Sequence, residues 1–236
     1  MANSFFQFKE FIIHQDQCAM KVSTDSCLFG GWVSSIQKNP KNVLDIGGGT
    51  GLLTLMLAQK SNSFFDCVEI ESECFEQLKA NINGSKWKDQ CAIFNEDIIN
   101  FKPEKKYDLI ISNPPFYENQ LNSTSDKINL ARHHSGLLLA DLFEVVEKNI
   151  TDDGTFFLLL PESRRSECIE KARALNFFPE YIVDVKQTNK HAIFRSMFCF
   201  TKISQQPLVN EIIIKEDDGN YSDTFVSLLK DYYFSL

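Results

Sequence analysis

Short apolar runs alternate with amphipathic stretches along most of the chain. The runs have the length of buried strands, and the stretches between them carry apolar residues at helical spacing, such as Phe75, Leu78 and Ile82. The predicted strands are 43–46, 65–70, 91–94, 107–112 and 155–160, and the predicted helices are 52–60, one that begins near 72, 138–150 and 162–175. Strands that alternate with helices in this way indicate an α/β fold, a mostly parallel sheet with helices on both faces.

The pattern changes after residue 177, where 180–185 and 194–201 form two predicted strands without a helix between them. Such a pair predicts a C-terminal antiparallel hairpin that closes the parallel sheet. A further strand over 211–215 and a final amphipathic helix complete the predicted elements.

Length and composition fit one globular domain, because 43% of the 236 residues are hydrophobic and 24% are charged. No linker or repeat divides the chain. We therefore expect a single domain, 1–236, in which an N-terminal segment (1–40) precedes a Rossmann-like core with a C-terminal extension (41–236).

Charge and cysteine usage exclude several classes of protein. A net charge of −8 argues against general binding of polyanions, so an RNA substrate would require a local concentration of basic residues. The seven cysteines are odd in number and scattered without a Cys-x-x-Cys pair, which predicts reduced core thiols and no metal site. We expect a cytoplasmic protein with no membrane partner, because no apolar run is long enough to span a bilayer and no secretory leader is evident.

Three glycines, Gly47, Gly49 and Gly51, follow the first predicted core strand and open a helix. Because glycine has no side chain, the backbone N–H groups of such a loop can approach a ligand closely. A nicotinamide-binding loop would have glycine three residues after the second glycine, where this chain has Leu52. The loop therefore predicts a different nucleotide-like ligand, with a plain tight turn as the alternative.

Acidic residues follow the next two strands. Glu69 ends one strand, where its carboxylate can accept hydrogen bonds from both hydroxyls of a ribose. Asp97 follows the next strand and could accept from an adenine amino group, although an ordinary turn aspartate remains the alternative. Ile70 and Ile98 are apolar enough to pack on the adenine ring, whereas we expect Glu71 to be a solvated charge.

The catalytic candidates are Asn113, Pro114, Pro115 and Phe116, directly after the strand 107–112. They place a carboxamide, backbone carbonyls that no helix uses and a flat ring at one strand end. Such a group suits an exocyclic amino group on a planar base. The alternative is a strand-terminating turn, since Asn before Pro favours extended or turn geometry.

Together these residues resemble the class I S-adenosylmethionine-dependent methyltransferases, and among them the amino methyltransferases with an Asn-Pro-Pro-aromatic motif. The stretch 8–25, Arg132 and the aromatic-rich tail from Tyr221 look like the tRNA(Val) (adenine-37-N6)-methyltransferase family, which modifies the adenosine beside the valine anticodon. The resemblance covers nearly the whole chain. It implies a seven-stranded sheet with S-adenosylmethionine bound over the carboxyl ends of the strands and S-adenosylhomocysteine as the product.

The resemblance also implies residue roles. Lys21, Thr24 and Asp25 would lie in a segment that closes over the methionine end of the donor, and Asp45 would lie near its amino group. Phe116 stands where the family more often has Tyr, which removes a hydroxyl and keeps the stacking face.

Arg132, Arg164 and Arg165 follow the catalytic strand and are candidate contacts to the phosphates of a tRNA anticodon stem-loop. A solvated helix face is the alternative for each of them. We expect a monomer or weak dimer.

Three other functions remain open. Methyltransferases that act on N2 of an rRNA guanine or on N5 of a protein glutamine share the motif, but the glutamine enzymes usually carry a helical N-terminal domain. Here only about forty residues precede the glycine loop. A non-catalytic RNA-binding or chaperone module is disfavoured, because the glycine loop, Glu69, Asn113 and Phe116 are all intact.

Overall fold

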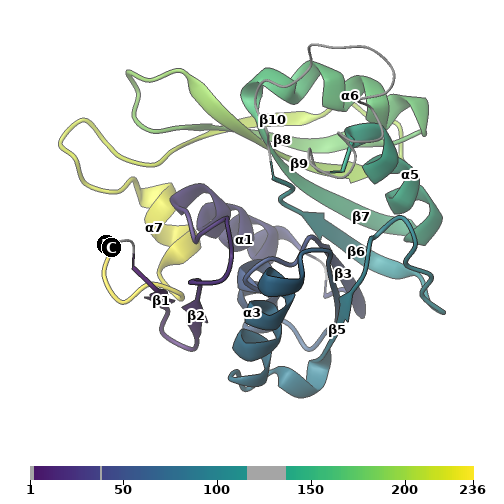
Figure 1. Ribbon diagram of the computed structural model, residues 1–236. Helices are drawn as coiled ribbons and strands as arrows, with labels where there is room; N and C mark the ends of the chain where they lie inside the picture. The colour runs from purple at the N-terminus through teal and green to yellow at the C-terminus, as the bar shows by residue number, and fades with distance from the viewer. Residues whose placement is uncertain (1–2, 38, 116–136) are drawn as a thin grey trace, which may run out of the picture.

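The computed structural model describes residues 3–37, 39–115 and 137–236, so Phe116 and Arg132 lie outside the described residues. A sheet of eight strands forms its centre, in the order β10-β8-β9-β7-β6-β3-β4-β5 (Figure 1). The strands of this sheet are β3 (Asn42–Ile46), β4 (Phe64–Glu69), β5 (Cys91–Asn95), β6 (Tyr107–Ser112), β7 (Ile150–Pro161), β8 (Phe178–Lys186), β9 (Ile193–Thr201) and β10 (Leu208–Ile213). The helices are α1 (Thr24–Ile36), α2 (Leu52–Ala58), α3 (Ser72–Asn83), α5 (Leu139–Asn149), α6 (Arg165–Ala174) and α7 (Asp223–Leu229), with short 3-10 turns η1 (Lys88–Gln90) and η2 (Glu162–Arg164).

Strands β3 to β7 pair in parallel, and β9 lies antiparallel between β7 and β8. The predicted fold class and the C-terminal antiparallel hairpin are therefore confirmed. The expected strand number of seven is wrong, because β10 pairs in parallel with β8 from Leu208 opposite Tyr181 to Ile213 opposite Lys186. This eighth strand adds an edge to the sheet without changing the order of the others.

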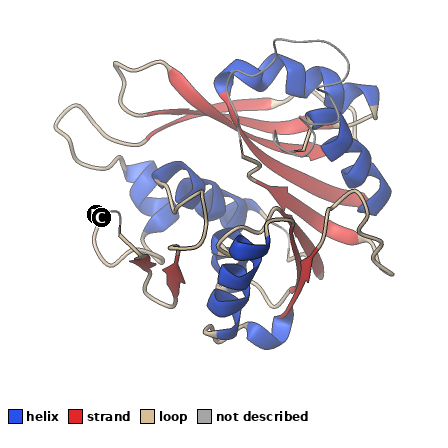
Figure 2. Ribbon diagram, viewed as in Figure 1, coloured by secondary structure: helices blue, strands red, loops and turns tan. Residues whose placement is uncertain are grey.

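Helices cover both faces of the sheet, as Figure 2 shows. Helices α1 and α7 lie side by side on the face opposite α5 and α6. Because successive side chains of a strand point to opposite faces, β3 sends Val43 into one apolar cluster and Leu44 and Ile46 into the other. Both faces of the sheet are thus buried, as expected of a mostly parallel sheet.

A separate hairpin of β1 (Phe5–Gln7) and β2 (Ile12–His14) precedes α1 and was not predicted. Aromatic side chains at its turn, Phe8 and Phe11, are buried in the same cluster as α1, α2 and α7. The chain ends meet here, because the Lys9 backbone N–H donates to the Tyr232 carbonyl at 2.8 Å.

The expectation that all cysteines are reduced is wrong. Cys18 and Cys74 form a disulfide with their Cα atoms 4.7 Å apart, and 56 positions separate them in the sequence. The other five are free thiols, and all but Cys91 are buried. No sequence spacing indicates this pairing, because it arises only when the segment after β2 packs against α3.

Among residues 3–37, 39–115 and 137–236, no group of three or more His, Cys, Asp or Glu side chains is placed to hold a metal ion. Within the same part of the chain, every helix is too short or too polar to cross a bilayer.

Candidate functional site

Three parts of the predicted site, the glycine loop, Glu69 and Asn113, meet at the carboxyl edge of the parallel strands. Ile46, the last residue of β3, lies opposite Val68 of β4 on one side and Ser112 of β6 on the other. The glycine loop, Glu69 and Asn113 follow these three positions directly, so the sheet register brings them to one edge. A further link is the Ser112 hydroxyl, which is buried and donates to the Ile46 carbonyl at 2.9 Å.

The glycine loop turns tightly between β3 and α2. Gly47 and Gly51 have φ values of 73° and 82°, in the left-handed region that favours glycine. A Cβ added at Gly47 would meet no atom within 4 Å, whereas one at Gly51 would lie 3.0 Å from a methyl of Leu78. The start of the loop thus faces open space and its end is packed against α3.

Glu69 is held by the backbone on both sides. One carboxylate oxygen accepts from Gly49 N–H and the other from Glu71 N–H, each at 2.9 Å. Each carboxylate oxygen can accept two hydrogen bonds, so these contacts orient the group and leave acceptor capacity for ligand hydroxyls. A ribose-binding role for Glu69 fits this geometry and stays a prediction.

Asp45 is buried beneath the loop. Its Oδ2 accepts from the Thr54 hydroxyl at 2.7 Å, while its Oδ1 has no hydrogen-bond partner among the described residues. Burial raises the pKa of Asp45 from 3.8 to about 6; the Thr54 hydrogen bond lowers the pKa and the charge of Glu69 raises it. The unpartnered acceptor is compatible with a role near the amino group of a donor molecule, and that role stays a prediction because the carboxylate is buried.

The residues proposed to contact adenine lie in different environments. The side chain of Asp97 accepts from Ile99 N–H at 3.0 Å, which is also typical of a turn aspartate. Ile70 is 61% exposed and is open to a ring, whereas Ile98 is buried in the core. Contact with adenine stays a prediction for all three, and Ile98 has little surface to offer.

The described part of the catalytic motif lies at the end of β6. Asn113 is half-buried, Pro114 is buried and Pro115 is exposed. Asn113 is therefore partly accessible at the end of β6, and its catalytic role stays a prediction.

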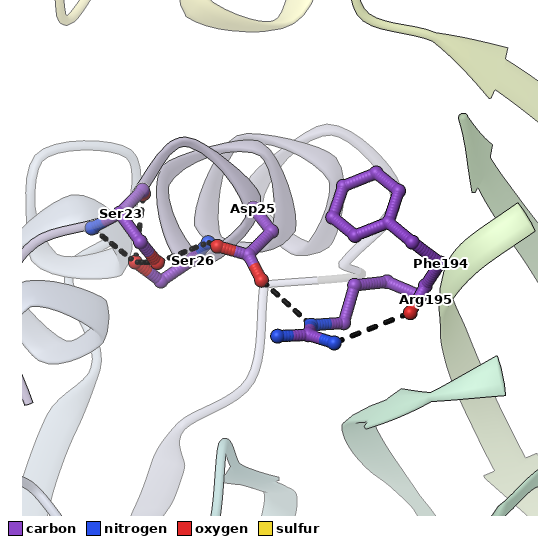
Figure 3. Close-up of polar contacts among 5 residues, drawn as sticks. All are labelled: Ser23, Asp25, Ser26, Phe194 and Arg195. Atoms are coloured by element: carbon purple, nitrogen blue, oxygen red, sulfur yellow. Dashed lines mark hydrogen bonds and ion pairs between the residues drawn. The ribbon is translucent and has the colours of Figure 1, made fainter. Parts of the chain in front are cut away.

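The N-terminal residues implied by the resemblance have partners in the structure. Lys21 is exposed and its ammonium donates to the Gln15 carbonyl at 2.7 Å. Thr24 is the first residue of α1 and is exposed. Asp25 accepts a hydrogen bond from Arg195 Nε at 2.8 Å (Figure 3). The donor-binding role is untested for all three, and the contact of Asp25 is with β9.

Both described arginines of the predicted RNA interface have acidic partners. Arg165 donates to Asp184 at 2.6 Å, and Asp184 also accepts from the buried Ser196 hydroxyl. Arg164 pairs with Glu167 at 3.0 Å, one turn along α6. RNA contact stays a prediction for both, and a phosphate would compete with these carboxylates.

Sequence reasoning missed two amides on α3 that hold the N-terminal segment. Gln77 accepts from Gln17 N–H at 3.1 Å. Asn81 accepts from His14 N–H at 3.0 Å and donates to the carbonyls of both His14 and Thr50, each at 2.8 Å. In the sequence, the one indication of this role is that both are polar residues next to the apolar positions Leu78 and Ile82 of α3.

Comparison with known proteins shows the family of this chain. Residues 30–159 match the family model "Methyltransferase small domain". A relative from Christiangramia forsetii, named tRNA1(Val) (adenine(37)-N6)-methyltransferase, is 36% identical over 100% of both chains. A relative of the same name from Trichodesmium erythraeum is 36% identical over 99% of both chains.

Solved structures show the same fold. A predicted O-methyltransferase from Agrobacterium tumefaciens superposes with a TM-score of 0.70 at 13% identity, covering 89% of this chain and 98% of its own. A glycopeptide N-methyltransferase in complex with S-adenosylmethionine superposes with a TM-score of 0.57 at 11% identity, covering 79% of this chain and 89% of its own.

Proposed function

The chain belongs to the tRNA1(Val) (adenine(37)-N6)-methyltransferase family, and on that premise we propose that it transfers a methyl group from S-adenosylmethionine to N6 of adenine 37 in a valine tRNA. The observation that carries the proposal is the place of Asn113, at the end of the strand beside the glycine loop. This neighbourhood puts a carboxamide next to the part of the sheet best suited to the donor.

The residues around the loop fit the donor. Gly47 opens onto free space, Glu69 offers an oriented carboxylate, and Asp45 has an unused buried acceptor among the described residues. We assign Glu69 to the ribose hydroxyls and Asp45 to the neighbourhood of the amino group, with Lys21 and Thr24 nearer the methionine end. When bound, S-adenosylmethionine supplies a methyl group carried on positively charged sulfur.

The chemistry assigned to the motif follows from the weakness of the nucleophile. The lone pair of the adenine amino group is delocalised into the ring, so the nitrogen is a poor nucleophile. The Asn113 side-chain oxygen and the Pro114 carbonyl would accept from both N–H groups and favour tetrahedral geometry at nitrogen. The nitrogen gains positive charge as it bonds to the methyl carbon and the bond from that carbon to sulfur breaks, so these acceptors bind the transition state more strongly than the ground state. The methylated nitrogen would then release one proton to solvent, which leaves neutral N6-methyladenosine. Phe116, outside the described residues, would stack on the flipped base.

The substrate is proposed to be the anticodon stem-loop, bound by one domain that acts as a monomer or weak dimer. Arg132, Arg164 and Arg165 are candidates for phosphate contacts. The acidic partners of Arg164 and Arg165 and the net charge of −8 imply local rather than general affinity for RNA.

A methylation assay with a matched variant tests the proposal. Purified protein, labelled S-adenosylmethionine and tRNA from a strain that lacks the gene should give labelled N6-methyladenosine at position 37 of valine tRNA. Asn113→Ala should lower the methylation rate at least about 100-fold, because it removes an acceptor used mainly in the transition state. Its affinity for the donor should stay within about 3-fold of wild type, since a change below about 0.7 kcal/mol is expected from a residue outside the donor site.

Several outcomes would contradict this assignment. Label on guanine N2 or on a protein glutamine would replace the substrate, while an unimpaired Asn113→Ala enzyme would reject the role of the carboxamide. Donor binding without transfer to any acceptor would favour a non-catalytic module.

A further inference from the structure

Residues 14–25, called the strap here, run from the end of β2 to the first turn of α1. At its first end the strap is fixed to α3 by three contacts. Asn81 binds both backbone groups of His14, Gln77 accepts from Gln17 N–H, and the disulfide joins Cys18 to α3. This end lies next to the glycine loop, because Asn81 also donates to the Thr50 carbonyl.

At its second end the strap is fixed to β9 by an ion pair. Arg195 Nε donates to one oxygen of Asp25 at 2.8 Å, and a terminal guanidinium nitrogen donates to the Phe194 carbonyl at 3.2 Å (Figure 3). The other Asp25 oxygen accepts from Ser26 N–H at 3.2 Å, and Ser23 caps the same turn. These two hydrogen bonds orient the Asp25 carboxylate and connect Arg195 to the first turn of α1.

A break in strand pairing lies next to Arg195. Val185 of β8 pairs with Arg195 and the next residue, Lys186, pairs with Ile193, so one residue of β9 is left out of register. Such bulges re-aim side chains and are frequent beside active sites. Phe194 packs against the same apolar cluster as α1, and the Arg195 guanidinium lies 5.5 Å from the centre of its ring.

The sheet register places Arg195 beyond the end of the catalytic strand. Ser112, the last residue of β6, lies opposite Leu158 of β7. Arg195 lies opposite Pro161, three positions further along β7. The ion pair therefore stands at the carboxyl edge, on the side of Asn113 away from the glycine loop.

We propose that Arg195 is a positioning residue for methyl transfer and that Asp25 acts through it. The pair fixes the second end of the strap to β9, so that a donor held under the strap and a base held at Asn113 keep one relative position. Asp25 then serves alignment and is not a donor ligand, unlike the role implied by the resemblance. This inference rests on the proposed function.

Because the Asp25–Arg195 pair is more buried than a surface ion pair, we expect it to stabilise the attachment of the strap to β9 more strongly. The side chains of Asp25 and Arg195 are 15% and 29% exposed, whereas those of Lys60 and Asp231, an ion pair that joins the end of α2 to the chain terminus, are 34% and 53% exposed. Exposed pairs contribute little, because water and salt screen them. Lys60 and Asp231 thus provide a matched control remote from the carboxyl edge.

The test compares Arg195→Gln, Asp25→Asn and the double variant with wild type. Misplacement of reacting groups by about 1 Å can slow a reaction about 100-fold, so each single variant should lower the single-turnover rate constant about 10- to 100-fold. Donor affinity by calorimetry should stay within about 3-fold, because the contacts of the strap with α3 are unchanged. The double variant should be no slower than the slower single one, since both changes break one contact.

Two further measurements separate alignment from loss of folding. Arg195→Lys keeps the charge but loses the planar fork, so it should restore part of the rate. Hydrogen exchange of the amides of residues 24–28 should be faster in Arg195→Gln and unchanged in Lys60→Gln, which should also methylate like wild type.

An Arg195→Gln enzyme with a wild-type rate constant would overturn the inference. So would an Asp25→Asn variant that weakens donor binding 10-fold or more while Arg195→Gln does not, because Asp25 would then be a donor ligand. The exchange measurement requires no tRNA. A wild-type protein inactive on tRNA would therefore count against the proposed function, whereas unchanged exchange in Arg195→Gln would reject the strap contact itself.

Discussion

Replacing Asp45 by Asn should change how stability depends on pH. The folded protein holds the pKa of this carboxyl at about 6 instead of 3.8, chiefly because burial disfavours the charged form. A raised pKa means that the folded state binds the proton more tightly than the unfolded state. The Asp45 charge therefore lowers stability progressively as the pH rises from about 4 to about 6, and the loss persists above that range.

The size of the effect follows from the shift. About two pKa units correspond to about 3 kcal/mol at neutral pH, of which about 1.4 kcal/mol develops between about pH 5 and about pH 8. Asn at this position carries no charge and can still accept from Thr54. Its new amide N–H group would replace an oxygen without a partner, which costs about 1–3 kcal/mol at every pH. The net stability at a single pH is thus less informative than the trend.

Urea unfolding of the ligand-free proteins at four pH values between 5 and 8 measures that trend. The free energy of unfolding of Asp45→Asn minus that of wild type should increase by about 1.4 kcal/mol across the range. Thr54→Val, which removes the hydroxyl that stabilises the charge, is the control and should steepen the pH dependence. A difference that is flat, or that falls as the pH rises, would show that Asp45 is not held as a destabilised carboxylate.

The remaining predictions concern the disulfide and the paired arginines. Cys18→Ser should lower the free energy of unfolding by up to about 4 kcal/mol in oxidising buffer, because the bond with Cys74 closes a long loop. The difference should vanish in reducing buffer, and equal losses in both buffers would point to packing instead. Arg165→Glu should destabilise by about 3 kcal/mol because it leaves the largely buried Asp184 unpaired. Arg164→Glu should change stability by less than about 1 kcal/mol yet weaken tRNA binding; unaltered tRNA affinity would exclude Arg164 from the interface.

Local sequence patterns were sufficient to predict the carboxyl edge of the sheet. Glu69 and Asn113 each end an apolar run, and in a parallel sheet such ends meet at one edge. The residue pattern had predicted a tail strand over 211–215, and the structure places this strand, β10, at Leu208–Ile213, paired with β8. The strand count was too low because the number seven was the one implied by the resemblance, which did not include this strand.

Pairings between distant residues could not be predicted in the same way. Asp25 and Arg195 are 170 positions apart, in a chain with 32 acidic and 24 basic residues. Nothing in the sequence favours this pair over the alternatives, and the same holds for Arg165 with Asp184 and for Cys18 with Cys74. Each depends on the final packing of distant segments against one another, which residue spacing does not encode.

The carboxamide of Asn81 links the N-terminal segment at His14 to the glycine loop at Thr50 through hydrogen bonds. One side chain satisfies both backbone groups of His14 and the carbonyl of Thr50, so neither segment can shift without leaving polar atoms of the other unsatisfied. Shortening the chain before Gln15, or attaching a bulky fusion there, would thus disturb a loop more than thirty positions away. An affinity tag on this protein is therefore better placed away from β2 (Ile12–His14).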